Sequence, residues 1–295
     1  MSVTPFGSAL RPVTVAEQTA YAEDGAVVLR GVIPPDCIER MRAAVDRVME
    51  EPGKGAVEYG EGEGRFFGDF LVWMRDPDFE AFALRSPLPE IAHALLGSLQ
   101  VRLFYDQLLV KEPGAKEETP WHQDLPYWPL RGDDIISLWA PFDDVTAESG
   151  AMRYVKGSHK AGILYAPTPF GRTSGFERVL AAAQLPPFPR AETFLQDADI
   201  LVCEMAPGDV IAHHPLVFHW SPGNLHPTLR RRALAMRYVG DHAAFDEAAA
   251  NFLAHPSLAA LLREPLSFKT GDRLGCSNFP LVWPRAITTA LAAGQ

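Results

Sequence analysis

Beyond residue 100 the sequence is a series of short segments rich in β-branched and aromatic residues, separated throughout by glycine and proline. These segments are 100–111, 135–142, 151–155, 209–212 and 231–240. Runs of this length and composition, bounded by turn residues, predict β-strands. Several short strands in series, preceded by helices, predict a mainly β fold, either a sandwich or a jelly roll with helical support.

The first hundred residues contain the helical signals. Residues 26–33 predict a short strand, and a helix is expected to follow, with Asp36 as its N-cap and Glu39 completing a capping box. Apolar residues recur at helical spacing after this point. A second helical stretch is expected over 79–97, interrupted by two prolines, and the glycine-rich residues 53–64 predict a surface loop.

Composition and charge narrow the class of partner. The 295 residues are 47% hydrophobic and 22% charged, which is typical of a globular protein with a substantial core. Lys and Arg number 27 against 37 Asp and Glu, so the net charge is −10, and the only tight basic cluster is 230–232. An acidic surface repels phosphate backbones, and we therefore expect a small-molecule substrate and no nucleic-acid partner.

The cellular location is inferred from sequence signals that are absent. No run approaches the roughly 18 apolar residues of a membrane span, so no membrane partner is expected. Residues 1–10 do not resemble a secretory signal, and three scattered cysteines form neither a disulfide framework nor a CxxC pair. These observations favour a cytoplasmic protein, and they do not indicate its oligomeric state.

The chain shows no internal repeat, linker or break in composition, so residues 1–295 are interpreted as a single domain. Within it, residues 161–200 are dense in proline and glycine. A loop of this length inside a compact domain is usually functional or disordered. We therefore expect 161–200 to be a lid or a substrate-binding insert.

Two side chains suited to binding a metal stand two residues apart in the segment 119–129, which reads TPWHQDLPYWP. On extended backbone, residues i and i+2 point to the same side, so His122 and Asp124 can converge on one ion. Mixed nitrogen and oxygen ligands on one face suit Fe(II) and leave the opposite face open. The pair alone is a weak signal, because a turn histidine capped by its neighbour explains it about equally well.

A third ligand is expected far along the chain, because a jelly roll brings distant strands face to face. His219 follows a strand that begins after Gly208, and with His122 and Asp124 it would complete a 2-His-1-carboxylate triad. Other histidines compete for this role, since a buried, hydrogen-bonded histidine is commoner than a metal ligand. The competitors are His213, His214 and His226.

Five stretches of the chain, in this order, resemble the phytanoyl-CoA dioxygenase family of Fe(II)- and 2-oxoglutarate-dependent oxygenases. They are VVLRGVIPPDCIERMR (27–42), DQLLVKEPG (106–114), PWHQD (120–124), WAPFDDVTAESGAMRYVKGSHK (139–160), and MAPGDVIAHHPLVFHWSPGN with RRRALAMRY (205–238). The resemblance implies a double-stranded β-helix of the jelly-roll, cupin-like type. It implies that His122, Asp124 and His219 bind Fe(II), and that 2-oxoglutarate and O2 are cosubstrates. The H-x-S-x-x-N pattern starts at His219 and at none of its competitors.

The resemblance also implies an arginine, soon after the distal histidine, that holds the C5 carboxylate of 2-oxoglutarate. A guanidinium suits this role because it grips a carboxylate with two hydrogen bonds and stays charged. Counting along from His219 favours Arg230, whereas aligning the R-R-A-L stretch favours Arg231. We favour Arg231, which shares a strand face with the small residues Ala233 and Ala235. Other positions that match the family's cosubstrate pocket are Ser221, Trp139 and Gln107.

The expected reaction is hydroxylation of an aliphatic carbon in a small molecule, with release of succinate and CO2. Family-like halogenases lack the metal-binding carboxylate, so the presence of Asp124 disfavours halogenation and leaves hydroxylation or desaturation. Two alternatives remain: a cupin-like metal dioxygenase or isomerase that uses no 2-oxoglutarate, and a non-catalytic jelly-roll binding protein. The candidate substrate contacts are Tyr127, Trp128, Phe66, Phe67 and Arg153. The sequence does not choose the substrate.

Overall fold

The computed structural model describes residues 6–60, 64–168, 184–196 and 198–285. Its helices are α1 (Val15–Asp24), α2 (Pro35–Glu50), α3 (Pro77–Arg85), α4 (Leu88–Leu96), α6 (Ala191–Phe194) and α7 (Pro256–Ala259). Its strands are β1 (Ala26–Leu29), β2 (Ala56–Glu58), β3 (Phe66–Phe70), β4 (Val101–Lys111), β5 (Thr119–His122), β6 (Leu130–Arg131), β7 (Ile135–Pro141), β8 (Met152–Val155), β9 (Ile200–Cys203), β10 (Val210–His213), β11 (His219–Ser221), β12 (Arg231–Val239), β13 (Ala244–Phe245) and β14 (Leu281–Trp283).

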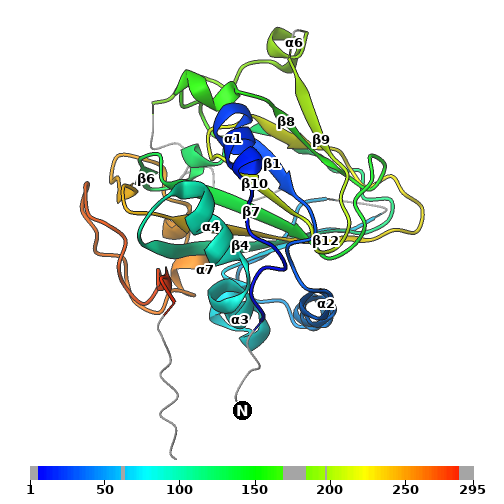
Figure 1. Cartoon of the computed structure of the whole chain (residues 1–295), viewed down its shortest axis with the longest axis horizontal. Helices are drawn as coiled ribbons and strands as arrows, with labels where there is room; N and C mark the ends of the chain where they lie inside the picture. Colours follow the sequence, from blue (N-terminus) through cyan, green and yellow to red (C-terminus); the bar gives the residue numbers. More distant parts are fainter. Residues whose placement is uncertain (1–5, 61–63, 169–183, 197, 286–295) are drawn as a thin grey trace, which may run out of the picture.

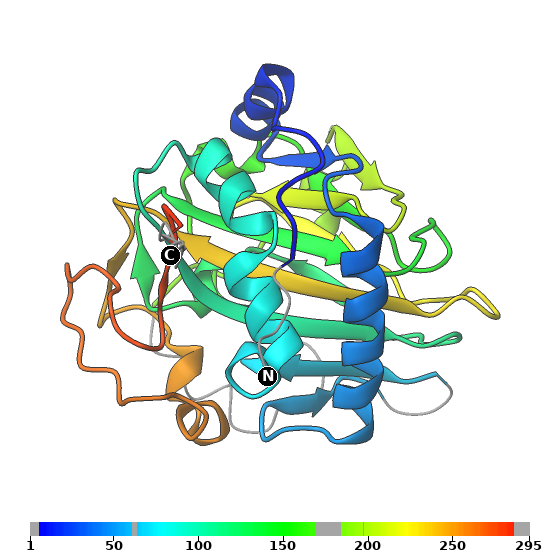
Figure 2. The ribbon, with the colours of Figure 1, turned by 60° about the horizontal axis from the view of Figure 1, so that its bottom comes forward.

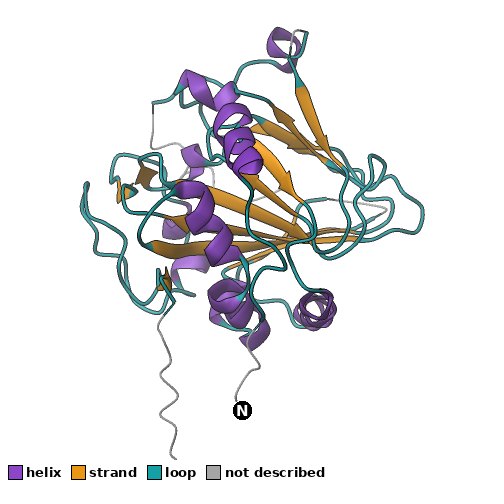
Figure 3. Ribbon diagram, viewed as in Figure 1, coloured by secondary structure: helices purple, strands orange, loops and turns teal. Residues whose placement is uncertain are grey.

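Two antiparallel sheets form the centre of the molecule. The large sheet has the order β1-β10-β7-β12-β4-β3-β2, with β14 added beside β4, and the small sheet has the order β5-β11-β8-β9. In Figure 1, β8 and β9 of the small sheet lie above β7, β12 and β4 of the large sheet. Figure 3 shows the strands gathered in the middle, with most of the helices at the periphery. Strands that are neighbours in a sheet but distant in the sequence are typical of a jelly roll.

Side-chain alternation divides the apolar residues between two cores. On β12, Leu234 and Met236 face a large core shared with the helices, whereas Ala233 and Ala235 face a smaller core between the two sheets. Successive residues of a strand point to opposite faces, so one strand contributes to both cores. Figure 2 shows α2 in blue and α3 and α4 in cyan, all lying across one face of the large sheet. The other face is therefore left to line the space between the sheets.

The helix boundaries correct one prediction and confirm another. α2 starts at Pro35 with Pro34 as its N-cap, and no side chain caps it, so the capping box at Asp36 and Glu39 is wrong. Proline is favourable at the first helical position because it has no N–H that would need a capping acceptor, and because its φ angle already suits a helix. The stretch over 79–97 is indeed helical and divided at its prolines, into α3 and α4.

Two further segments differ from the sequence expectations. Residues 53–64 were expected to be a loop, but Ala56–Glu58 forms β2 and pairs with β3; residues 61–63 lie outside the described part of the chain. Of the expected insert 161–200, residues 169–183 and 197 are likewise not described. Among the helices that the structure does describe, none is both long enough and apolar enough to cross a bilayer.

A buried carboxyl group in β4 provides a stability prediction. Asp106 has no solvent exposure, its Oδ2 accepts the Trp73 N–H at 3.0 Å, and its Oδ1 has no hydrogen-bond partner among the described residues. Burial raises the pKa of Asp106 to about 8. At a pH between its ordinary pKa value and 8, the folded protein therefore keeps a proton on this carboxyl group, whereas the unfolded chain has lost it. The contribution of Asp106 to the free energy of unfolding therefore decreases as the pH rises from the pKa of Asp106 in the unfolded chain towards 8.

Asp106→Asn keeps the shape of the side chain and does not titrate. We expect its advantage over the wild type in free energy of unfolding to grow by about 1.4 kcal/mol per pH unit between pH 5 and pH 8. Urea unfolding of both proteins at several pH values measures this difference. Asp133→Asn, at an exposed position, is the control and should show no such trend. A constant difference between Asp106→Asn and the wild type would contradict the prediction.

Candidate functional site

A cavity opens between the two sheets. Its volume is about 1060 Å³, including the part open to solvent. Both sheets contribute to its lining, together with the turn after β5 and a residue from the C-terminal region. The lining includes Tyr59, Phe70, Tyr105, Gln107, His122, Asp124, Tyr127, Trp128, Trp139, Thr168, His213, His219, Arg231, Arg237 and Phe252.

The structure brings the three predicted metal ligands together at this cavity. His122 ends β5 and pairs directly with His219 on β11 in the small sheet. Asp124 follows two residues later, where its backbone N–H donates to the carbonyl oxygen of Pro215 at 2.9 Å. One ligand atom from each of the three buried side chains lies within 4.8 Å of the others. Asp124 Oδ1 is 3.6 Å from His122 Nε2 and 3.7 Å from His219 Nε2.

Hydrogen bonds at the far side of each imidazole orient the rings. His122 Nδ1 lies 2.7 Å from the carbonyl oxygen of Pro120, and His219 Nδ1 lies 3.0 Å from that of Val217. A carbonyl oxygen only accepts, so each Nδ1 carries the hydrogen and each Nε2 keeps a lone pair directed at the site. A metal-bound histidine is typically held in this way. Two imidazole nitrogens and one carboxylate oxygen suit Fe(II), so the residues fit the ion that the sequence predicts.

The second oxygen of Asp124 is held by the large sheet. Its Oδ2 accepts hydrogen bonds from Ser137 Oγ at 2.7 Å and His213 Nε2 at 3.2 Å, and Arg237 Nη2 lies 3.8 Å away. Ser137 is the register partner of both His213 and Arg237. Burial alone would raise the pKa of Asp124, but Arg237 and the histidines outweigh it and hold the pKa well below its usual range. The carboxylate is thus kept ionised, with Oδ1 directed at the two ligand imidazoles.

His213 is therefore a supporting residue in this arrangement and not a fourth ligand. Its Nε2 donates to Asp124, and its Nδ1 lies 3.2 Å from the hydroxyl of Tyr154, so both ring nitrogens are engaged. The sequence analysis missed Ser137 and Arg237. The alternation of β12 was a usable signal for Arg237, because it places that residue on the same face as Arg231.

Arg231 is a buried guanidinium without a counter-charge. It lines the cavity at 1% exposure, and Nη1 donates to the carbonyl oxygen of Gly150 at 2.7 Å and to Ser221 Oγ at 3.0 Å. Among the described residues no carboxylate oxygen lies within 4.0 Å of it, and its Nε has no hydrogen-bond partner. Burial lowers the pKa of Arg231 to about 10. A buried cation of this kind requires an anion, and a carboxylate of a diacid would supply one.

The other positions predicted for the cosubstrate pocket lie in the wall of the same cavity or next to Arg231. Trp139 lines the cavity with its Nε1 unpartnered among the described residues, and the guanidinium carbon of Arg231 is 5.5 Å from its ring centroid. Gln107 also lines the cavity, with its amide donating to the Tyr59 hydroxyl at 3.0 Å. Ser221 is not among the lining residues and contacts Arg231 from behind.

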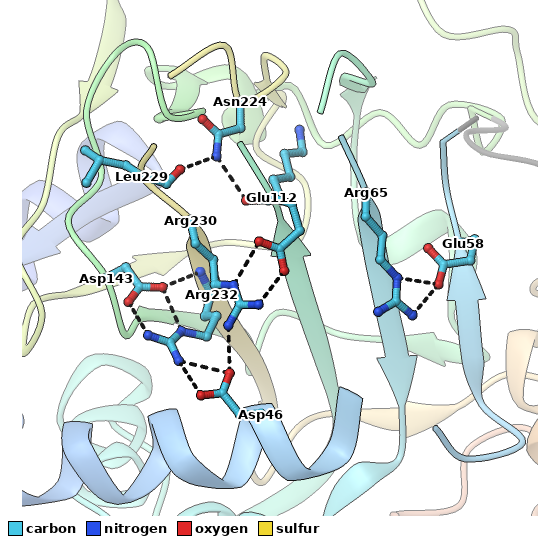
Figure 4. A network of polar contacts seen from close by, with 10 residues as sticks. Asp46, Glu58, Arg65, Glu112, Asp143, Asn224, Leu229, Arg230 and Arg232 are labelled. Atoms are coloured by element: carbon cyan, nitrogen blue, oxygen red, sulfur yellow. Dashed lines mark hydrogen bonds and ion pairs between the residues drawn. The ribbon is translucent and has the colours of Figure 1, made fainter. Parts of the chain in front are cut away.

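Arg230, the alternative choice for the carboxylate, points to the opposite side of the strand. Figure 4 shows its guanidinium between Glu112 and Asp46, with Arg232 paired to Asp143 and Asp46 beside it. Arg230 Nη1 is 2.7 Å from Asp46 Oδ1, and its Nη2 is 2.7 Å from Glu112 Oε1. Period-two alternation puts Arg230 and Arg232 on one face of β12 and Arg231 on the other. Arg230 is therefore a surface ion-pair residue in this structure and is not part of the cavity.

Two of the expected substrate contacts line the cavity and the others do not. Tyr127 and Trp128 are in its wall. Phe66 and Phe67 are fully buried in apolar clusters outside the cavity lining, Phe67 in the core that the large sheet shares with the helices. Arg153 lies over the ring of Trp220 at 5.0 Å, away from the cavity, because its neighbours on β8 take the inward positions.

Several wall residues were missed by the sequence analysis. Phe70 and Tyr105 lie on strands, where aromatic residues more often pack in a core than line a site. Phe252 comes from the C-terminal 50 residues, in which no motif was identified. Thr168 belongs to the start of the expected insert, and its Oγ1 donates to the carbonyl oxygen of Trp121 at 3.2 Å, which holds this part of the chain beside β5.

Comparison with known proteins shows the family of this chain. The family model described as Phytanoyl-CoA dioxygenase (PhyH) matches residues 21–233. The probable phytanoyl-CoA dioxygenase of Caenorhabditis elegans is 24% identical over 244 residues, which are 75% of this chain and 73% of that protein. The peroxisomal phytanoyl-CoA dioxygenase of Mus musculus is 23% identical over 227 residues, which are 72% of this chain and 64% of the mouse protein.

Solved structures share the fold. The non-heme alpha ketoglutarate dependent carbocyclase SnoK from nogalamycin biosynthesis has a TM-score of 0.70 at 23% identity, over 95% of this chain and 100% of that one. The alpha ketoglutarate dependent epimerase SnoN from nogalamycin biosynthesis has a TM-score of 0.69 at 23% identity, over 90% and 95% of the two chains. The predicted mainly β jelly-roll, cupin-like fold is confirmed.

Proposed function

This chain belongs to the phytanoyl-CoA dioxygenase family, whose members are Fe(II)- and 2-oxoglutarate-dependent oxygenases, and from that premise we propose that it hydroxylates an aliphatic carbon of a small molecule. The observation that carries the proposal is the pairing of two features in one cavity. One is the cluster of His122, Asp124 and His219, and the other is the unpaired buried guanidinium of Arg231.

The role of each residue follows from its contacts. When bound, iron and 2-oxoglutarate supply the oxidising chemistry, in which O2 is consumed and succinate and CO2 are released. His122, Asp124 and His219 would hold the iron from one side of the cavity. Arg231 would bind the C5 carboxylate of 2-oxoglutarate, with Ser221 and the carbonyl oxygen of Gly150 fixing the guanidinium. A metal dioxygenase or isomerase that uses no diacid has no need of this buried arginine.

The walls of the cavity favour a compact, mostly apolar substrate. Aromatic rings line it, and the polar atoms of three of them are hydrogen-bonded within the protein: Tyr127 donates to the carbonyl oxygen of Thr168, and the Tyr105 hydroxyl accepts from Trp128 Nε1 at 2.8 Å. Only Trp139, among the described aromatic residues of the wall, has a ring N–H without a partner. Ring faces are therefore what these residues offer to a substrate, with Phe70 and Phe252 beside them. Apolar walls also exclude water from the reacting carbon, as an oxidation of a C–H bond requires.

The test is a panel of apolar, ring-bearing small molecules incubated with the iron-loaded protein, 2-oxoglutarate and O2. We expect at least one to raise succinate release well above the substrate-free rate and to gain one oxygen atom in mass. A product of unchanged mass, or one that has lost two hydrogens, would mean that the reaction is not a hydroxylation but another oxidative reaction. If the protein binds iron but forms no succinate with any compound, the proposed function is wrong.

A further inference from the structure

A second buried basic side chain lies beside Arg231 and has no role in the function proposed above. Lys111 ends β4, has no solvent exposure, and pairs in register with Arg231 on one side and Phe66 on the other. Its Nζ donates to the carbonyl oxygen of Pro222 at 2.6 Å and lies 4.6 Å from the Phe66 ring centroid. It is also 3.4 Å from Ser221 Oγ, the hydroxyl that accepts a hydrogen bond from Arg231. The two cationic side chains thus meet at one hydroxyl group.

In the described part of the chain, no acidic group neutralises this pair at close range. Among the described residues no carboxylate oxygen lies within 4.0 Å of Lys111 Nζ, as was found for Arg231. Like charges directly opposite each other in a sheet are destabilising, and burial makes an unpaired charge much more costly. Arg231 lines the cavity, whereas Lys111 is not among its lining residues and lies behind Arg231. The placement of two basic residues here is explained if an anion binds at Arg231.

Some of the groups around Lys111 lower the pKa of its amine, and others raise it. Burial lowers the pKa of the Lys111 amine well below its ordinary value, and Arg231 on β12 lowers it further. Glu117 and Glu118, in the segment between β4 and β5, raise it by smaller amounts. Glu112, the next residue along, is ion-paired with Arg230 on the other side of the sheet. Without an added anion, this environment therefore favours the neutral form of the amine more strongly than water does.

We propose that Lys111 is a positioning residue that supplies the second positive charge of the cosubstrate pocket, and that its amine takes up a proton when a dicarboxylate binds at Arg231. A carboxylate at Arg231 places negative charge beside Lys111, which stabilises the ammonium form. The proton comes from solvent and stays on Nζ, where it strengthens the hydrogen bonds to Pro222 and Ser221. This inference rests on the proposed function, because the dicarboxylate is 2-oxoglutarate.

The experiment is calorimetric titration of the anaerobic, Fe(II)-loaded protein with 2-oxoglutarate, in two buffers of equal pH and different ionisation enthalpy. We expect about one proton to be taken up per molecule bound, and the Kd to rise by up to about tenfold per pH unit above the pKa of Lys111 in the unliganded protein. The matched ligand is 2-oxobutanoate, a 2-oxo acid without the distal carboxylate. It should bind without this proton uptake.

Three variants separate charge from structure. Lys111→Met has a similar volume and cannot titrate, so it should bind 2-oxoglutarate roughly tenfold or more weakly, without proton uptake. Lys111→Arg stays charged and should restore binding, also without uptake. Lys54→Met, at an exposed position, should behave as the wild type. The wild-type comparison of the two ligands stands even if a Lys111 variant fails to fold.

The experiment distinguishes failure of the Lys111 inference from failure of the proposed function. If 2-oxoglutarate binds to the wild type with no more proton uptake than 2-oxobutanoate, or if Lys111→Met takes up the same number of protons, this inference is wrong and the proposed function is untouched. If 2-oxoglutarate does not bind to the iron-loaded wild type at all, the proposed function fails and this inference fails with it.

Discussion

Replacing His219 by alanine is expected to abolish tight Fe(II) binding, whereas the same change at His213 is expected to leave the iron bound. The two rings are only 4.8 Å apart and both line the cavity, so proximity does not distinguish them. The way in which each Nε2 faces Asp124 does distinguish them. His219 directs Nε2 at Asp124 Oδ1, whereas His213 uses Nε2 to hold Asp124 Oδ2.

The measurement is anaerobic Fe(II) titration followed by metal analysis, with the visible charge-transfer band after 2-oxoglutarate addition as a second readout. Loss of a supporting residue typically lowers metal affinity by about 10- to 100-fold, and we expect this for His213→Ala. Loss of a ligand should be far more severe, with neither iron retention nor the band in His219→Ala. His242→Ala removes an exposed histidine and should match the wild type. If His219→Ala retains iron and His213→Ala loses it, then His213 is the metal ligand and His219 is the supporting residue.

Replacing Arg231 by alanine is expected to raise the 2-oxoglutarate concentration required for half-maximal turnover by roughly 100-fold or more, with little change in Fe(II) affinity. Removing one partner of a buried, hydrogen-bonded charge pair typically costs about 2–5 kcal/mol of binding free energy. Fe(II) binding should persist because Arg231 has no hydrogen bond to any of the three ligand side chains.

Arg230→Ala provides the matched control, since it removes a guanidinium one residue away. Its ion pairs with Asp46 and Glu112 are partly exposed, so the expected loss is at most about 1 kcal/mol of folding stability, with unchanged dependence on 2-oxoglutarate. Steady-state succinate formation over a range of 2-oxoglutarate concentrations measures both variants. A raised requirement in Arg230→Ala but not in Arg231→Ala would show that the opposite strand face carries the cosubstrate site.

Local sequence patterns predicted the parts of the site that lie within one strand or one turn. The i, i+2 spacing of His122 and Asp124 placed two donors on one side of an extended segment, and the structure brings both to the cavity. Alternation along β12 separated Arg231 from Arg230 before any tertiary information was used. A period of two residues is a property of the strand itself, so it can be identified from the residues alone.

Other parts of the site depend on contacts between strands that are distant in the chain. Ser137 and His213 hold Asp124 because β7 and β10 are neighbours in the large sheet, and no local pattern marks either residue as a partner of a metal ligand. Phe252 reaches the cavity from a C-terminal region without a recognisable motif. Phe67 was misjudged because an aromatic residue on a strand has the same local signal whether it faces a core or a cavity.

By itself, then, the sequence determined several of the strands, the faces on which their side chains alternate, and the residue types suited to an iron ion and a diacid. Only the tertiary structure decided which oxygen of Asp124 faces the imidazoles, how His213 is used, and that Lys111 lies directly opposite Arg231. The physical reason is that alternation follows from the backbone of a single strand. Which strands face one another, and in what register, follows from how the whole chain buries its two cores.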